Sequence, residues 1–222
     1  MSDLVVGLAD AKPAPGPTDG NQAAATPSND GRARCSWAAS TVDYAHYHDT
    51  EWGRPVDDER TLYEKLCLEG FQSGLSWLTI LRKREAFRDA FANFDATRVA
   101  GFGSSDVDRL LDNSGIIRHR GKIEASISNA QTLVRLWDEG GSLASLIWSF
   151  QPERSAPPRS FDDVAASTPE SAALAKELKR LGFRFVGPTT TYAAMQAMGV
   201  VNDHLEGCWV REVCDVPTTR ED

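Results

Sequence analysis

The sequence predicts an all-α domain. Apolar residues recur at three- and four-residue spacing through most of the chain, and the alternating pattern typical of strands is almost absent. The first predicted helix covers residues 59–69, where Leu62, Tyr63 and Leu66 show the helical spacing. Asp57 is its expected N-cap, because a short acidic side chain can accept a hydrogen bond from the first helical turn.

The other predicted helices follow in chain order. One covers 75–91, one begins at Ser105, and the rest cover 123–137, 169–181 and 189–198. Gly115 and the glycines at 140 and 141 are expected to end two of them. Residues 151–170 are rich in proline and serine and predict a long loop.

Composition divides the chain into three parts. Residues 1–33 lack apolar periodicity and predict a disordered leader, 34–208 form the expected domain, and 209–222 a C-terminal tail. The apolar runs are too short to span a membrane, and no secretion signal is recognisable. Four cysteines are too few for a disulfide scaffold in a chain of 222 residues, so we expect a cytoplasmic protein with reduced thiols.

The net charge of -8 argues weakly against a nucleic-acid partner. Residues 34–208 hold 20 basic and 24 acidic side chains, which gives 20 − 24 = -4 for the expected domain. The basic residues gather at 82–84, 118–122 and 176–184. A local patch of this kind can bind phosphate whatever the overall sign, so charge does not exclude DNA.

Two cysteines and two histidines stand near the ends of the expected domain, at Cys35, His48, His204 and Cys208. If residues 204–208 are helical, His204 and Cys208 lie on one face. Two thiolates and two imidazoles form a closed tetrahedral set that suits structural zinc. The alternative is that the cysteines are small core residues. His46 and Cys214 are other possible ligands.

The segment 182–189 joins two predicted helices and contains glycine at both 182 and 187. Glycines let the backbone approach a ligand closely, and the N-terminus of the following helix offers free N–H groups to an anion. A helix-hairpin-helix element holds a DNA phosphate in this way without reading base sequence. An ordinary helix connection remains the alternative.

Glu69 closes an apolar helix and is followed by Gly70, Gly74 and Trp77. Such a carboxylate is commonly an exposed last-turn residue. It can also face a cleft walled by Trp77 and the aromatic residues of segment 37–52. One carboxylate among aromatic faces suits a flat, cationic ligand that carries an amine.

Taken in order, these motifs resemble the DNA-3-methyladenine glycosylase I family of the helix-hairpin-helix glycosylase superfamily. The likeness covers residues 34–208. Its matching stretches are CSW at 35–37, YAHYHDTEWG at 44–53, LEGFQSGLSW at 68–77, SGIIRHRGKI at 114–123, IWSF at 147–150, LGFRFVGPT at 181–189 and VNDHLEGC at 201–208.

The resemblance implies a structural zinc ion that joins the two ends of the domain, with Cys35, His48, His204 and Cys208 as its ligands. It also implies a base-recognition glutamate at Glu69. The implied catalytic set is Glu69, Tyr47 and Trp77, and the implied base-binding set is Trp37, Tyr44, Tyr47, Glu69, Leu75 and Trp77. The DNA-binding hairpin falls on Gly182, Arg184, Gly187 and Thr189.

The function implied is a DNA repair hydrolase that flips 3-methyladenine out of alkylated double-stranded DNA and hydrolyses its N-glycosidic bond. Many enzymes of the superfamily carry a catalytic Asp two residues before the position of His204, where this chain has Asn202. The motif holds no lysine nucleophile, so we expect a monofunctional enzyme that leaves an abasic site. The alternative is a non-catalytic, zinc-stabilised DNA-binding module. A monomer without membrane attachment is expected.

Overall fold

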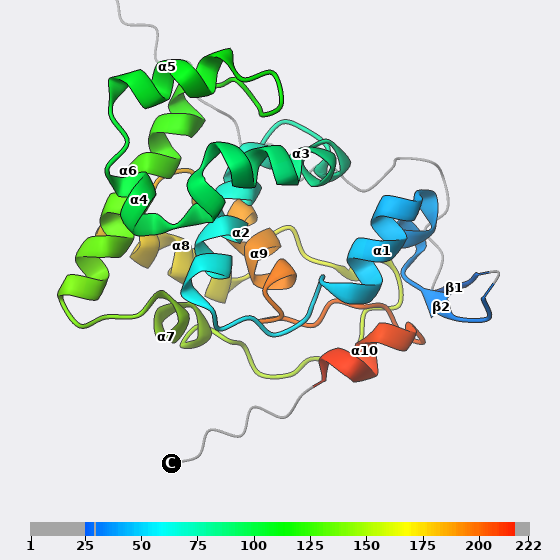
Figure 1. Ribbon diagram of the computed structural model, residues 1–222. Helices are drawn as coiled ribbons and strands as arrows, with labels where there is room; N and C mark the ends of the chain where they lie inside the picture. Colours follow the sequence, from blue (N-terminus) through cyan, green and yellow to red (C-terminus); the bar gives the residue numbers. More distant parts are fainter. Residues whose placement is uncertain (1–24, 29, 216–222) are drawn as a thin grey trace, which may run out of the picture.

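The computed structural model describes residues 25–28 and 30–215, and the helical prediction is confirmed (Figure 1). The first elements are the antiparallel two-residue pair β1 (Thr26–Pro27) and β2 (Ala33–Arg34), the 3-10 helix η1 (Ser36–Ser40), and helices α1 (Val42–Thr50), α2 (Glu59–Gln72) and α3 (Trp77–Ala90). The next are η2 (Ala92–Phe94), α4 (Ala96–Ala100), α5 (Ser104–Asp112), α6 (Arg120–Asp138) and α7 (Leu143–Trp148). The last are η3 (Phe161–Asp163), α8 (Pro169–Leu181), α9 (Pro188–Ala197) and α10 (Trp209–Cys214).

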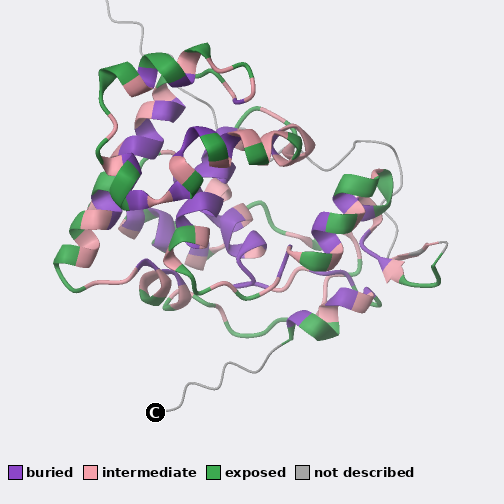
Figure 2. Ribbon diagram, viewed as in Figure 1, coloured by how far each residue is buried: buried purple, intermediate pink, exposed green. Residues whose placement is uncertain are grey.

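The core lies among helices α2 to α9, and α2 runs through its centre. Buried residues are concentrated along α2, α6 and α9 (Figure 2). Pairs such as α4 with α6 and α8 with α9 pack against each other. Large side chains including Tyr63, Phe71 and Phe87 are fully buried there, and each contributes about 1.5–3 kcal/mol of hydrophobic free energy.

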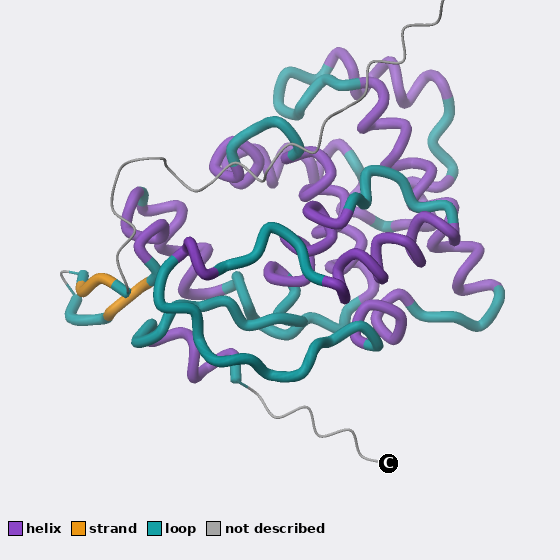
Figure 3. The backbone as a smooth tube through the Cα atoms, turned by 180° about the vertical axis from the view of Figure 1, so that it is seen from behind, coloured by secondary structure: helices purple, strands orange, loops and turns teal. Residues whose placement is uncertain are grey.

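A second, smaller group forms where the two ends of the described chain meet. The pair β1–β2, η1 and α1 lie beside α10, apart from the main helical core (Figure 1). Cys35, Leu205, Cys208 and Val210 form a separate buried cluster at this junction. The long loop after α7 runs out to the same region before it returns to α8, as the view from behind shows (Figure 3). There the Glu206 N–H donates to the Pro158 carbonyl over 2.8 Å.

Gly199 lets the segment before α2 approach the end of α9, because only glycine fits there. Its φ is +73°, and a Cβ would lie 2.5 Å from the Arg54 carbonyl carbon. This close approach allows the Val56 N–H to donate to the Met198 carbonyl at the end of α9. The segment that leads into α2 is thereby fixed against the C-terminus of α9.

Several predicted boundaries are corrected by the structure. Asp58, not Asp57, caps α2, because its carboxylate accepts from the Thr61 N–H over 2.8 Å. The helix predicted from residue 75 begins at Trp77, with Ser76 as its N-cap. Helices α4 and α7 were not predicted.

The predicted division of the chain also differs from the observed elements. Strand β1 and the first residue of β2 lie within 1–33, predicted as a disordered leader, and α10 lies within the predicted tail. Residues 1–24, 29 and 216–222 of those segments lie outside the described residues.

Candidate active site and metal centre

Glu69 lies in the last turn of α2 and is buried, with 5% of its surface exposed. Among residues 25–28 and 30–215, none forms a hydrogen bond or ion pair with its carboxyl group. Burial raises the pKa of Glu69 to about 8, although the nearby Lys65 cation acts in the opposite direction. A buried acid without a partner is a marker of a binding or catalytic site, because its desolvation otherwise destabilises the fold.

Four aromatic side chains form a cluster near α1. Trp37 comes from η1, Tyr44 and Tyr47 from α1, and Trp77 from the start of α3. The ring centroids of Trp37 and Tyr44 are 5.4 Å apart, and those of Tyr47 and Trp77 are 5.5 Å apart. Burial raises the pKa of Tyr47 well above its usual value, and the negative charge of Glu69 adds to the increase. Tyr47 is therefore the member of the aromatic cluster whose hydroxyl group senses the charge of Glu69.

The Glu69 carboxyl and two indole N–H groups near this cluster have no partner in the described part of the chain. Lys65 is not free to neutralise Glu69, because its ammonium donates to Glu51 over 2.9 Å. The indole N–H groups of Trp37 and Trp77 are buried and have no hydrogen-bond partner in the described part of the chain. One carboxyl and two indole donors among aromatic rings can bind a flat molecule that carries both donors and acceptors.

Leu75 lies in the turn between α2 and α3 and is half-buried. The turn is fixed by Lys122 of α6, whose ammonium donates to the Phe71 carbonyl over 2.9 Å and to the Ser73 carbonyl over 2.6 Å. Lys122 thus satisfies carbonyl groups at the end of α2 that have no helical partner. The sequence analysis missed this role, because Lys122 is 47 residues beyond Leu75 in the sequence.

The segment 182–189 connects α8 to α9, as predicted. Gly182 ends α8 in the left-handed conformation, with φ of +112°, and Gly187 is the N-cap of α9. The buried Asn129 of α6 fixes the turn, because its side chain accepts from the Arg184 N–H and donates to the Arg184 carbonyl. The Arg184 side chain is exposed, and Thr189 lies in the first turn of α9.

The structure brings Cys35, His48, His204 and Cys208 together at the junction of the chain ends. All four are buried, and their ligand atoms lie within 4.8 Å of one another. His48 Nε2 is 3.2 Å from His204 Nδ1 and 3.3 Å from Cys208 Sγ, and Cys35 Sγ is 3.6 Å from His204 Nδ1. Ligands about 2.0–2.3 Å from a tetrahedral metal ion are about 3.3–3.8 Å apart, so the cluster could hold such an ion.

The local structure that brings His204 and Cys208 together differs from the prediction. Residues 204–208 are not helical, so the argument from one helical face is wrong. A turn with Gly207 at φ of +79° brings His204 and Cys208 together instead. The His204 ring is oriented by its Nε2, which lies 3.1 Å from the Trp52 carbonyl and leaves Nδ1 facing the cluster.

The two alternative ligands do not belong to this cluster. His46 lies on α1 and is exposed, and Cys214 lies at the end of α10 outside the group of four. The four cysteines are all free thiols in the structure.

Asn202 and Asp203 have structural partners. The Asn202 amide donates to the Arg211 carbonyl over 3.1 Å and to Asp215 over 2.9 Å, while its oxygen accepts from the His204 N–H. The Asp203 carboxylate accepts from the Tyr192 hydroxyl over 2.7 Å. Both side chains therefore stabilise the turn that carries His204.

Asn202→Asp is accordingly expected to lower the melting temperature. The substitution removes two donated hydrogen bonds and places a second carboxylate beside Asp215, a loss of about 1–3 kcal/mol. For a domain of this size the shift is about 2–12 °C at pH 7, measured by differential scanning calorimetry. The double variant Asn202→Asp/Asp215→Asn restores one donor and should recover part of the loss. An unchanged melting temperature in the single variant would contradict this role.

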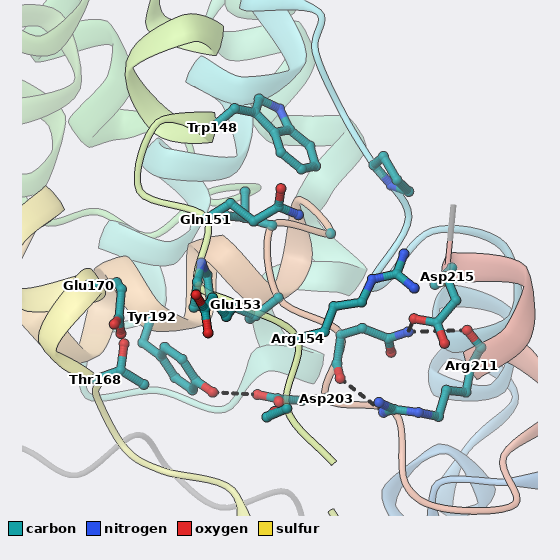
Figure 4. A pocket seen from close by; sticks show the side chains of 18 of the residues that line it. Trp148, Gln151, Glu153, Arg154, Thr168, Glu170, Tyr192, Asp203, Arg211 and Asp215 are labelled. Carbon is teal, nitrogen blue, oxygen red and sulfur yellow. Dashed lines mark hydrogen bonds between the residues drawn. The ribbon is translucent and has the colours of Figure 1, made fainter. Parts of the chain in front are cut away.

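A cavity elsewhere in the structure contains none of the predicted base-binding residues. Its volume is about 910 Å³, and it opens between the loop after α7 and the segment that carries α10 (Figure 4). Tyr192 and Asp203 face each other across one side, and Arg211 donates to the Asn202 and His204 carbonyls. The sequence did not predict this cavity, because its lining comes from segments far apart in the chain, among them Pro55, Trp148, Tyr192 and Arg211.

No helix within residues 25–28 and 30–215 is both long and apolar enough to cross a membrane.

The chain is similar to known proteins in both sequence and structure. The chain matches the family model described as methyladenine glycosylase over residues 37–212. DNA-3-methyladenine glycosylase 1 of Escherichia coli (strain K12) is 46% identical over 178 residues, which cover 79% of this chain and 95% of the relative. A crystal structure of a 3-methyladenine DNA glycosylase I is 50% identical with a TM-score of 0.77, covering 79% of this chain and 98% of the other. A structure described as the basis of 3-methyladenine recognition by the Staphylococcus aureus glycosylase is 34% identical with a TM-score of 0.76, covering 80% and 96%.

Proposed function

The chain belongs to the methyladenine glycosylase family, and we propose that Glu69 and the aromatic cluster around it form the pocket in which this DNA repair enzyme recognises 3-methyladenine. The enzyme is a hydrolase of N-glycosyl bonds. The observation that carries the proposed site is the buried Glu69 carboxyl beside Tyr47, which has no partner among the residues that the structure describes. A base enters such a pocket only when it is flipped out of the duplex.

Glu69 provides the selectivity. Adenine methylated at N3 in DNA carries a positive charge, and a cation beside the carboxyl favours its ionised form. The methylated base therefore gains an ion pair in the pocket and hydrogen bonds from its exocyclic amine. Unmodified adenine is neutral and gains no ion pair with Glu69, so it binds in the pocket more weakly than the methylated base. The rings of Trp37, Tyr44, Tyr47 and Trp77 stack on the base, with Leu75 alongside.

Bond cleavage needs little further assistance from the protein. The positive charge weakens the glycosidic bond, and the base leaves as a neutral molecule. Water attacks the sugar carbon and leaves an abasic site. Lys65, the lysine nearest Glu69 along α2, is paired with Glu51, which supports a monofunctional reaction without an amine nucleophile. Asn202 replaces the catalytic Asp of related enzymes without loss, because the substrate is activated by its own charge.

The segment 182–189 acts as a helix-hairpin-helix element that holds a DNA phosphate. The free N–H groups at the start of α9 attract an anion, and the exposed Arg184 adds a positive charge. Gly182 and Gly187 allow the backbone to approach the DNA, and Thr189 contributes from the first turn of α9. These contacts fix the duplex without reading its sequence.

The four-residue cluster binds structural zinc. Two thiolates and two imidazoles are a complete set for a tetrahedral ion and leave no open position for substrate. The ligands come from both ends of the domain, so the ion stabilises their junction. We also propose a monomer and a cytoplasmic location, since cysteines that bind zinc or remain free thiols fit a reducing compartment.

The test is release of free bases from alkylated duplex DNA, separated by chromatography. We expect 3-methyladenine to appear, with strand breaks only after alkaline treatment of the abasic sites. DNA binding and bound zinc without any released base would instead support a non-catalytic binding module. Strand breaks without alkali would contradict the monofunctional reaction.

A further inference from the structure

A chain of hydrogen bonds connects the β1–β2 pair to His48. His48 Nδ1 lies 2.9 Å from the Asp49 carboxylate. Asp49 in turn accepts from Arg34, whose Nε lies 2.9 Å from one carboxylate oxygen and whose Nη2 lies 2.7 Å from the other. Arg34 also donates to both oxygens of Asp30, over 2.8 and 2.6 Å. The guanidinium therefore lies between two carboxylates, and each receives two of its N–H groups.

This arrangement fixes which nitrogen of His48 faces the metal cluster. A carboxylate accepts only from a protonated nitrogen, so Asp49 keeps the proton on Nδ1. Nε2 then carries the lone pair, and it is the atom that lies 3.2 Å from His204 Nδ1. Carboxylates in this position orient metal-binding histidines and increase their basicity.

The position of the ion pair in the sequence adds to this effect. Arg34 directly precedes Cys35, and Asp49 directly follows His48. One bidentate contact therefore restrains the backbone beside two ligands that are 13 residues apart. Arg34 is also buried, with 7% of its surface exposed, so solvent screens the contact weakly.

A second contact joins the segment between β1 and β2 to the residue beside a third ligand. The Arg32 guanidinium lies 4.5 Å from the ring centroid of Trp209, the residue that follows Cys208. The N-terminal segment therefore contacts residues adjacent to Cys35, His48 and Cys208. Arg32 and Arg34 precede the part of the chain that matches the family model.

We propose that Arg34 and Asp49, supported by Asp30, are positioning residues of the metal centre that hold His48 with Nε2 toward the ion and slow its release. This inference rests on the proposed zinc site. It assigns a role to the N-terminal strands that neither DNA binding nor base recognition requires. The readout is metal release, which is measured without DNA.

The test compares zinc release from the full-length protein to excess 4-(2-pyridylazo)resorcinol, followed by absorbance. We expect Arg34→Gln and Asp49→Asn each to release zinc about 10–100-fold faster than the parent protein. Arg34→Lys should give an intermediate rate, because it keeps the charge but loses the planar fork. The double variant Arg34→Gln/Asp49→Asn should be no faster than the faster single variant, since both remove the same contact.

The matched control is Arg82→Gln. Arg82 pairs with Asp43 of α1 over 2.8 Å, but both side chains are exposed and neither residue adjoins a ligand. Its release rate should equal that of the parent. If Arg34→Gln does not fold, Asp49→Asn alone decides the question. Parent-like release from a zinc-loaded Asp49→Asn variant overturns the positioning role and leaves the zinc site intact. A parent protein without zinc overturns the zinc site and the positioning role together.

Discussion

Glu69→Gln is expected to reduce base release about 100-fold or more while raising the melting temperature at pH 8. The amide keeps the size of the side chain and can still form hydrogen bonds. It cannot become negative, so the ion pair that holds the flipped cationic base in the pocket is lost, and less of the bound DNA reaches the reactive arrangement. The rate is measured as 3-methyladenine released from alkylated DNA in single turnover.

The stability effect has the opposite sign because the carboxyl is buried without a partner. Burial raises the pKa of Glu69 to about 8 in the folded protein, above the usual value of 4.5 for an unfolded glutamate. Between these two values the folded state retains a proton that the unfolded state has released. The free energy of unfolding therefore falls as the pH rises from 4.5 to 8. Glutamine does not titrate, so the variant escapes this loss.

We expect Glu69→Gln to gain about 2 kcal/mol at pH 8, or about 4–8 °C in melting temperature, and much less at pH 5. Calorimetry at both pH values measures the difference. A lower melting temperature than the parent at pH 8 would show that the Glu69 carboxylate has a stabilising partner. Base release within threefold of the parent would remove Glu69 from base recognition.

Glu64→Gln is the matched control on the same helix. Glu64 is buried like Glu69, but its carboxylate pairs with Arg88 over 2.7 Å. The same substitution there removes a charge that has a partner. We expect it to lower the melting temperature and to leave base release at the parental rate. Opposite stability changes at the two positions would isolate the effect of the missing partner at Glu69.

The helical core could be predicted from the sequence because its long helices carry clear apolar spacing. The helix predicted over 169–181 matches α8 at both ends, since Pro169 begins it and Gly182 ends it. Helices α4 and α7 were missed because five and six residues are too few to establish a period. The β1–β2 pair was missed because two-residue strands in a polar segment carry no alternation.

The residues of the candidate site could be predicted from the sequence, but their arrangement in space could not. The sequence suggested Cys35, His48, His204 and Cys208 as one set of metal ligands. The expected helix over 204–208, however, is not what brings His204 and Cys208 together. The turn at Gly207 achieves the same approach. The partners that orient the ligands, the Trp52 carbonyl and the Asp49 carboxylate, depend on contacts between distant segments. A single sequence does not encode such contacts in any local pattern.

Cys208→Ser is expected to reduce bound zinc from one ion per chain to a small fraction and to lower the melting temperature by about 6–12 °C. Serine keeps the shape of the side chain but is a poor zinc ligand at neutral pH. The cluster joins residues 169 positions apart, so metal binding there contributes folding free energy, and we expect a loss of about 3 kcal/mol. Zinc content is measured by atomic absorption and stability by calorimetry.

A chelator separates the loss of metal from a packing defect. EDTA should lower the melting temperature of the parent toward that of Cys208→Ser and should leave the variant unchanged. Cys214→Ser is the control, since Cys214 is also buried at the chain junction but lies outside the group of four. It should keep one zinc per chain and its sensitivity to EDTA. If Cys208→Ser retains stoichiometric zinc while Cys214→Ser loses it, Cys214 is the ligand, because the ion then depends on the thiol at the end of α10.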